Sequence, residues 1–152
     1  MEFLITKIEK KEEKERYIND LHGIDISNDL KNELISSDLW AIISEKTCYG
    51  LGTVVENNEI SARISHFMIN NKLLETNVAI SLFINMEIYC IKKDYEQITV
   101  KIPANIRGLS GKMKKFFKKV GFKIEFKEIG FEGEFILLIK NGIKKCYKAV
   151  TE

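Results

Sequence analysis

The most restrictive feature of this sequence is a strand pattern that leads directly into a long helical pattern. In residues 59–69, EISARISHFMI, apolar and polar side chains come close to alternating, as they do in a strand with one buried face. Residues 72–92 contain no glycine or proline, and their apolar side chains recur every three or four positions, at Leu74, Val78, Leu82, Met86 and Tyr89. The pattern predicts a long central strand followed at once by a helix packed on the sheet.

The other segments extend this unit into an α+β order. Three further helices are predicted: one within residues 9–22, one capped by Ser27 or Asn28, and a basic one over residues 112–120 that ends at Gly121. Short apolar and β-branched runs predict six more strands, at residues 2–8, 39–45, 49–56, 98–102, 122–128 and 134–140. We therefore expect a mixed, mostly antiparallel sheet flanked by helices.

Length and composition favour a single intracellular domain. The chain has 152 residues, 45% of them hydrophobic and 30% charged, which suits one globular domain over residues 1–152. No stretch is apolar enough for a membrane span, and we expect no export signal, so a cytoplasmic location is predicted. Cys48, Cys90 and Cys146 form no metal-binding spacing and are expected to be reduced thiols, with Cys48 in a turn between two strands.

Charge is distributed unevenly along the chain. Residues 1–100 carry 11 Lys and Arg against 17 acids, whereas residues 101–148 carry 13 against 4. A nucleic-acid interface on the basic helix is one interpretation, because five lysines there surround Phe116 and Phe117. A helix also needs a buried face, and these two phenylalanines supply it. We favour helix packing for them and do not expect nucleic acid as a partner.

Two local patterns resemble the GNAT acyltransferase family. ISHFMINNKLLETNVAISLF resembles the family's central strand, cofactor loop and main helix, and KMKKFFKKVGF resembles its last helix and the strand that follows. The resemblance implies a GNAT-like fold and acetyl-CoA as co-substrate, with no metal. It also implies cofactor contacts at the end of the strand, at the loop and at one asparagine beyond them: Met68, Ile69, Leu74, Glu75, Thr76, Asn77, Val78, Ala79 and Asn105. On strict spacing Ser110 matches the family's asparagine, and Asn105 takes its place if the loop has an insertion.

The loop departs from the family pattern of Arg or Gln, two residues, Gly, one residue, and Gly or Ala. Leu74 stands at the Arg or Gln position and Asn77 at the first glycine, and Glu75 adds a negative charge; only Ala79 agrees. Phe117 stands where the family usually has a tyrosine that protonates the departing thiolate, and a phenyl ring cannot donate a proton. These differences leave open a second interpretation, a catalytically degenerate module that binds a ligand or regulates.

His66 is the candidate general base. It lies three residues before the end of the predicted central strand, and the ordinary pKa of histidine, near 6.5, suits proton transfer at neutral pH. The alternative is a structural histidine held by hydrogen bonds. The resemblance implies acetyl transfer from acetyl-CoA to a primary amine of a small molecule or peptide. A homodimer is left open as the assembly, and we expect no membrane partner.

Overall fold

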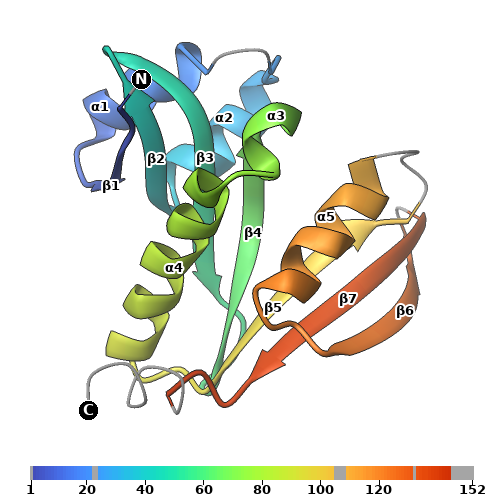
Figure 1. The fold of residues 1–152 in the computed structure, drawn as a ribbon. Helices are drawn as coiled ribbons and strands as arrows, with labels where there is room; N and C mark the ends of the chain where they lie inside the picture. The colour runs from blue at the N-terminus through green and yellow to red at the C-terminus, as the bar shows by residue number, and fades with distance from the viewer. Residues whose placement is uncertain (1, 22–23, 105–108, 132, 145–152) are drawn as a thin grey trace. The chain divides into compact units, whose positions relative to one another are not determined.

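The structure, a computed structural model, describes residues 2–21, 24–104, 109–131 and 133–144 (Figure 1). It contains helices and strands in the predicted order, which confirms the α+β class. The predicted helix over residues 72–92 is divided in two by a break at Glu75 and Thr76. In chain order the elements are β1 (Leu4–Ile8), α1 (Lys11–Asn19), α2 (Asn28–Ile35), β2 (Asp38–Ser44), β3 (Thr47–Glu56), β4 (Ser61–Ile69), α3 (Asn71–Leu74), α4 (Asn77–Lys92), β5 (Gln97–Pro103), α5 (Leu109–Lys119), β6 (Ile124–Gly130) and β7 (Gly133–Asn141).

The strands form one sheet in the order β1-β2-β3-β4-β5-β7-β6. The β1–β2, β2–β3, β5–β7 and β6–β7 pairs are antiparallel, and the β4–β5 pair is parallel. By its contacts the chain groups into two compact units. The first unit comprises Met1–Val55 and Ser65–Met86, and the second comprises Glu56–Ile64 and Glu87–Glu152. That the whole chain behaves as one domain stays a prediction.

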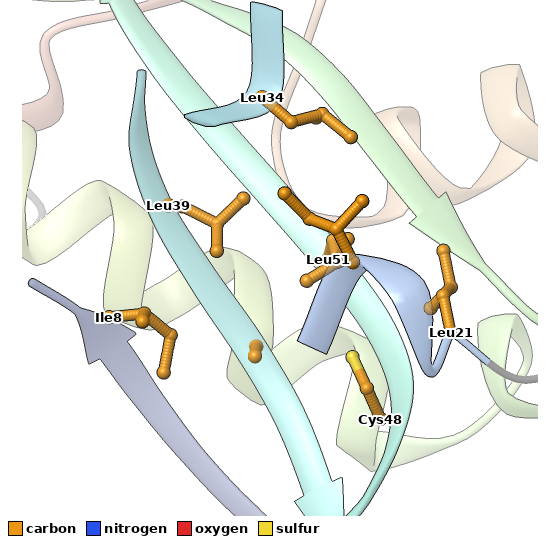
Figure 2. Packing of buried hydrophobic residues seen from close by; sticks show 8 residues of the cluster. Ile8, Leu21, Leu34, Leu39, Cys48 and Leu51 are labelled. Carbon is orange, nitrogen blue, oxygen red and sulfur yellow. The ribbon is translucent and has the colours of Figure 1, made fainter. Parts of the chain in front are cut away.

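In the first unit, helices bury both faces of β2 and β3. On one face, side chains from β1, β2 and β3 meet α1 and α2 in a cluster of Ile8, Ile18, Leu21, Leu34, Leu39, Ala41, Cys48 and Leu51 (Figure 2). On the other face, Gly52 lies under α4, where a β-carbon would come within 2.5 Å of Met86 Sδ. Burial on two faces explains why β3 is a nearly continuous buried run instead of an alternating one.

Cys48 was predicted to lie in a turn, and the structure corrects this. It lies inside β3 with its side chain fully buried, because the turn is formed by Glu45 and Lys46, both at positive φ (51° and 66°). Two consecutive left-handed residues match the twist of the flanking strands, so the hairpin closes earlier than the sequence pattern indicated.

In the second unit, α5 packs against one face of the sheet formed by β5, β7 and β6. Phe116, Phe117 and Phe122 are buried there, with ring centroids 5.2 Å apart in both neighbouring pairs. This confirms the predicted packing role of the two helix phenylalanines. Within the described ranges, no helix is long and apolar enough to cross a membrane.

Candidate functional site

The strand that carries His66 changes its buried face just before this residue. Ala62 and Ile64 are buried in the first half of β4, whereas Phe67 and Ile69 are buried in the second half. The pattern is therefore shifted by one position, as an inserted β-bulge residue would shift it, and Ser65 and His66 are both partly exposed at the shift. Two successive side chains can then approach the same neighbouring strand.

Both side chains reach Thr53 on β3. His66 Nδ1 lies 3.0 Å from Thr53 Oγ1, and Ser65 Oγ lies 2.6 Å from the same oxygen. Thr53 is fully buried, so its hydroxyl is held in one place by the packing around it. A buried hydroxyl with two polar neighbours fixes the orientation of the imidazole ring.

The second ring nitrogen faces a carboxylate from α2. His66 Nε2 lies 3.3 Å from Glu33 Oε2, and the two side chains are 20% and 67% exposed. In one neutral tautomer Nδ1–H donates to Thr53 and Nε2 keeps a free lone pair, and in the other Nε2–H donates to Glu33 while Nδ1 accepts from Thr53; in the charged ring, both N–H groups find an acceptor. The arrangement can therefore hold a proton on His66 without leaving a donor unsatisfied.

The predicted cofactor loop is mostly helical. After β4, Asn70 caps the short helix α3, and its side chain accepts a hydrogen bond from the Lys72 amide at 2.9 Å. Thr76 then caps α4: its hydroxyl donates to Leu73 O at 2.6 Å and accepts from the Val78 amide at 3.3 Å. Asn77 has a negative φ, so the left-handed conformation that a glycine would favour is not used here.

These residues fit the diphosphate of coenzyme A through the backbone only. The start of α4, a helix of 16 residues, offers the amides of Asn77 and Ala79, and the amide of Val78 once Thr76 releases it. Leu74 is buried and faces the interior, while the side chain of Glu75 is exposed. No side chain of Leu74–Ala79 supplies a positive charge.

The other predicted cofactor residues divide into three cases. Ile69 is buried beside the position that a β-carbon on Gly50 would occupy, and Met68 is half-buried against the cluster around Leu51, so both side chains are engaged in packing. Ala79 is fully buried in the first turn of α4, and Val78 is half-buried. Asn105 lies outside the described residues, and its predicted role stays a prediction.

Two further residues from the sequence analysis have structural roles. Phe117 is fully buried, so a hydroxyl added to its ring would enter the packed interior of the second unit. Burial raises the pKa of the Cys48 thiol to about 11, and its Sγ donates to Gly50 O at 3.3 Å, so it is an ordinary buried thiol. Among the residues placed by the structure, no group of three His, Cys, Asp or Glu side chains could hold a metal ion.

Sequence reasoning missed Thr53, Ser65 and Glu33. Their separations from His66 in the chain follow no motif, and only the register of β3 against β4 and the position of α2 bring them together. Thr53 did carry one signal, since it is a polar residue inside a run of buried strand positions. Such a residue needs a hydrogen-bond partner, which the structure provides.

Comparisons with solved structures concern the whole architecture. Similar folds include a GNAT family acetyltransferase from Elizabethkingia anophelis with acetyl-CoA bound, at 14% identity over 91% of this chain and 97% of that chain, with a TM-score of 0.67. An N-acetyltransferase from Staphylococcus aureus is 14% identical over 94% and 99% of the two chains, with a TM-score of 0.71.

A third similar structure, an aminoglycoside 6'-N-acetyltransferase complexed with coenzyme A, is 12% identical over 91% of this chain and 96% of that chain, with a TM-score of 0.70. No protein-family model matches the sequence, and no curated protein matches it significantly. At these identities the likeness is one of fold.

Proposed function

This chain has the GNAT fold, and from that premise we propose that it is an acyl-CoA-dependent N-acyltransferase. The acyl donor is acetyl-CoA, and the acceptor is a primary amine of a small molecule or a peptide. Acetyl-CoA supplies an activated thioester, and the amine nitrogen forms the new C–N bond as the C–S bond breaks.

The observation that carries the proposal is the oriented imidazole of His66 on the central strand. An amine is mostly protonated at neutral pH and must lose a proton before it can attack the thioester. In the neutral tautomer whose Nδ1–H donates to Thr53, His66 Nε2 has a free lone pair and takes this proton, and the imidazolium that results is stabilised by Thr53 at Nδ1 and by Glu33 at Nε2. Thr53 acts as a positioning residue, and the exposed carboxylate of Glu33 attracts the ammonium form of the acceptor.

The donor is held by the start of α4. Backbone amides of Asn77–Ala79 bind the diphosphate, aided by the positive end of the helix dipole. The exposed carboxylate of Glu75 opposes this binding. With phenylalanine at position 117, the departing thiolate takes its proton from water or from the acylated nitrogen.

Isothermal titration calorimetry with acetyl-CoA and CoA tests the donor half. Glu75→Lys should tighten binding, because it replaces an opposing charge near the diphosphate with a favourable one; Asn77→Gly should tighten it by removing a β-carbon from the approach. Glu12→Lys, on the exposed face of α1, is the control for a change of net charge alone. If the affinity for coenzyme A were unchanged in both loop variants, coenzyme A would not bind at this loop.

Steady-state kinetics with acetyl-CoA and a panel of amines test the acceptor half. His66→Ala should lower kcat/KM by about a hundredfold, the usual contribution of a general base. Because a histidine base must be neutral to accept a proton, activity should rise with pH through the histidine pKa, and this dependence should disappear in His66→Ala. Full activity in His66→Ala would exclude His66 as the general base.

A second candidate is a module that keeps the fold but has lost turnover. The loop favours it in one respect: buried Leu74, exposed Glu75 and the Thr76 cap leave fewer groups for a diphosphate than a glycine-rich loop would. Acetyl-CoA binding without turnover for any amine would support a regulatory module. Absence of binding would instead support a module for a different ligand.

A further inference from the structure

The second unit presents an open strand edge that carries large apolar side chains. In the described sheet β6 is a terminal strand, bonded to β7 on one side only, so its other edge has free backbone N–H and C=O groups. Ile124 is 36% exposed and Phe126 is 53% exposed on this seven-residue strand. An unpaired edge with exposed apolar residues is a site where another strand can pair.

The two faces of β6 differ in their surroundings. Glu125 faces α5, where it forms ion pairs of 3.0 Å with Lys114 and 2.9 Å with Lys118. Phe126 faces the opposite side, beside Leu137 of β7 and in line with Lys101 of β5. On the side away from α5, the exposed ring of Phe126 therefore lies beside an apolar row on β7, which consists of Phe135, Leu137 and Ile139.

We propose that this edge pairs with β6 of a second copy of the chain, antiparallel about a two-fold axis at Phe126. In this register Phe126 lies opposite itself, and Glu125 lies opposite Lys127 of the second copy, twice by symmetry. Because the two-fold axis is perpendicular to the sheet, the faces that lie away from α5 fall on the same side in both copies. The apolar row therefore continues from one copy into the other.

The charges select this register over its neighbours. An axis at Glu125 would place that carboxylate opposite itself and Lys127 opposite Lys123, and an axis at Lys127 would place two lysines opposite each other. Both arrangements set like charges directly across a strand pair, which is destabilising. Of the three registers, only the one centred on Phe126 pairs unlike charges and buries the aromatic ring. Because the shared edge is short, the dimer should be reversible.

Sedimentation of the full chain over a concentration series tests the assembly. The parent chain should pass from monomer to dimer, and Phe126→Asp should weaken the dimer at least about tenfold because it places two carboxylates at the axis. Phe131→Asp is the matched control: it makes the same chemical change at an exposed phenylalanine outside the paired strand. A parent chain that is monomeric throughout, or equal weakening in both variants, would overturn the proposal.

Disulfide trapping tests the register independently of any effect of Phe126→Asp on folding. All chains carry Cys146→Ser, and Cys48 and Cys90 are buried. Phe126→Cys should form an intermolecular disulfide, because residues directly opposite in a strand pair have Cα atoms about 4.5–5.5 Å apart. Glu128→Cys should not, because it lies four residues away from its symmetry mate. Equal cross-linking of both variants, or of neither, would refute this register.

Discussion

We expect the buried ion pair between Lys140 and Glu87 to be a major determinant of stability in the second unit. Lys140 Nζ lies 2.6 Å from Glu87 Oε2, and the side chains are only 12% and 11% exposed. At this distance the ammonium and the carboxylate form a close ion pair with little access to water. Lys140 also donates to Val120 O at 2.8 Å and thereby joins α4, β7 and the end of α5.

The expected magnitude follows from burial. Lys140→Met removes the cation and leaves a carboxylate in a site with little access to water, which costs about 3–5 kcal/mol. For a domain of this size the midpoint of thermal unfolding should fall by roughly 6–20 °C. Glu87→Met should cost a similar amount. The double variant should cost less than either single one, because two apolar side chains replace both charges and leave neither unpaired.

The matched control is the exposed pair of Lys101 and Glu128, 3.6 Å apart with side chains 45% and 43% exposed. Lys101→Met should cost less than about 1 kcal/mol, because solvent screens that interaction. If Lys140→Met cost no more than Lys101→Met, or if the double variant cost as much as the two single ones together, the reasoning from burial would be wrong.

Urea unfolding of Lys140→Met, followed by tryptophan fluorescence and by circular dichroism, also tests whether the chain is one domain or two. The single tryptophan, Trp40, is buried in the first unit, whereas the substitution lies in the second. Far-UV circular dichroism reports both units. If the chain is one cooperative domain, as predicted, Lys140→Met should shift the fluorescence and dichroism transitions together. If part of the dichroism transition shifted while the fluorescence transition stayed in place, the two units would be folding independently.

Three further predictions concern packing, thiol reactivity and helix capping. Gly52→Ala should destabilise the chain by about 1–3 kcal/mol in thermal unfolding, because the new β-carbon would displace Met86; an unchanged midpoint would mean that Met86 moves at no cost. Cys48, with its pKa raised to about 11, should resist iodoacetamide at about pH 8 in the native chain and react after unfolding, as peptide mass spectrometry would show. Ser27→Ala should cost about 1 kcal/mol in urea unfolding, because the serine hydroxyl accepts from the Leu30 amide at the start of α2.

The local pattern of the sequence was sufficient to predict most elements and their order. Alternation predicted β4, and apolar spacing predicted the helix that follows, because side-chain direction repeats every two residues in a strand and every 3.6 in a helix. The buried role of Phe116 and Phe117 followed from the same argument. The break at Glu75 and Thr76 was missed because the side-chain cap that Thr76 supplies depends on the local path of the chain, which apolar spacing does not specify.

Tertiary structure alone assembled the candidate site. His66 could be selected from the sequence by its chemistry, but its contacts with Thr53 and Glu33 could not, because they depend on the register between two strands and on the position of a helix. The same is true of Lys140 and Glu87, which lie far apart in the chain and meet only when α4 and β7 are in place. A pattern along the chain specifies which face of an element is apolar, whereas the pairing of individual polar side chains depends on how the elements pack.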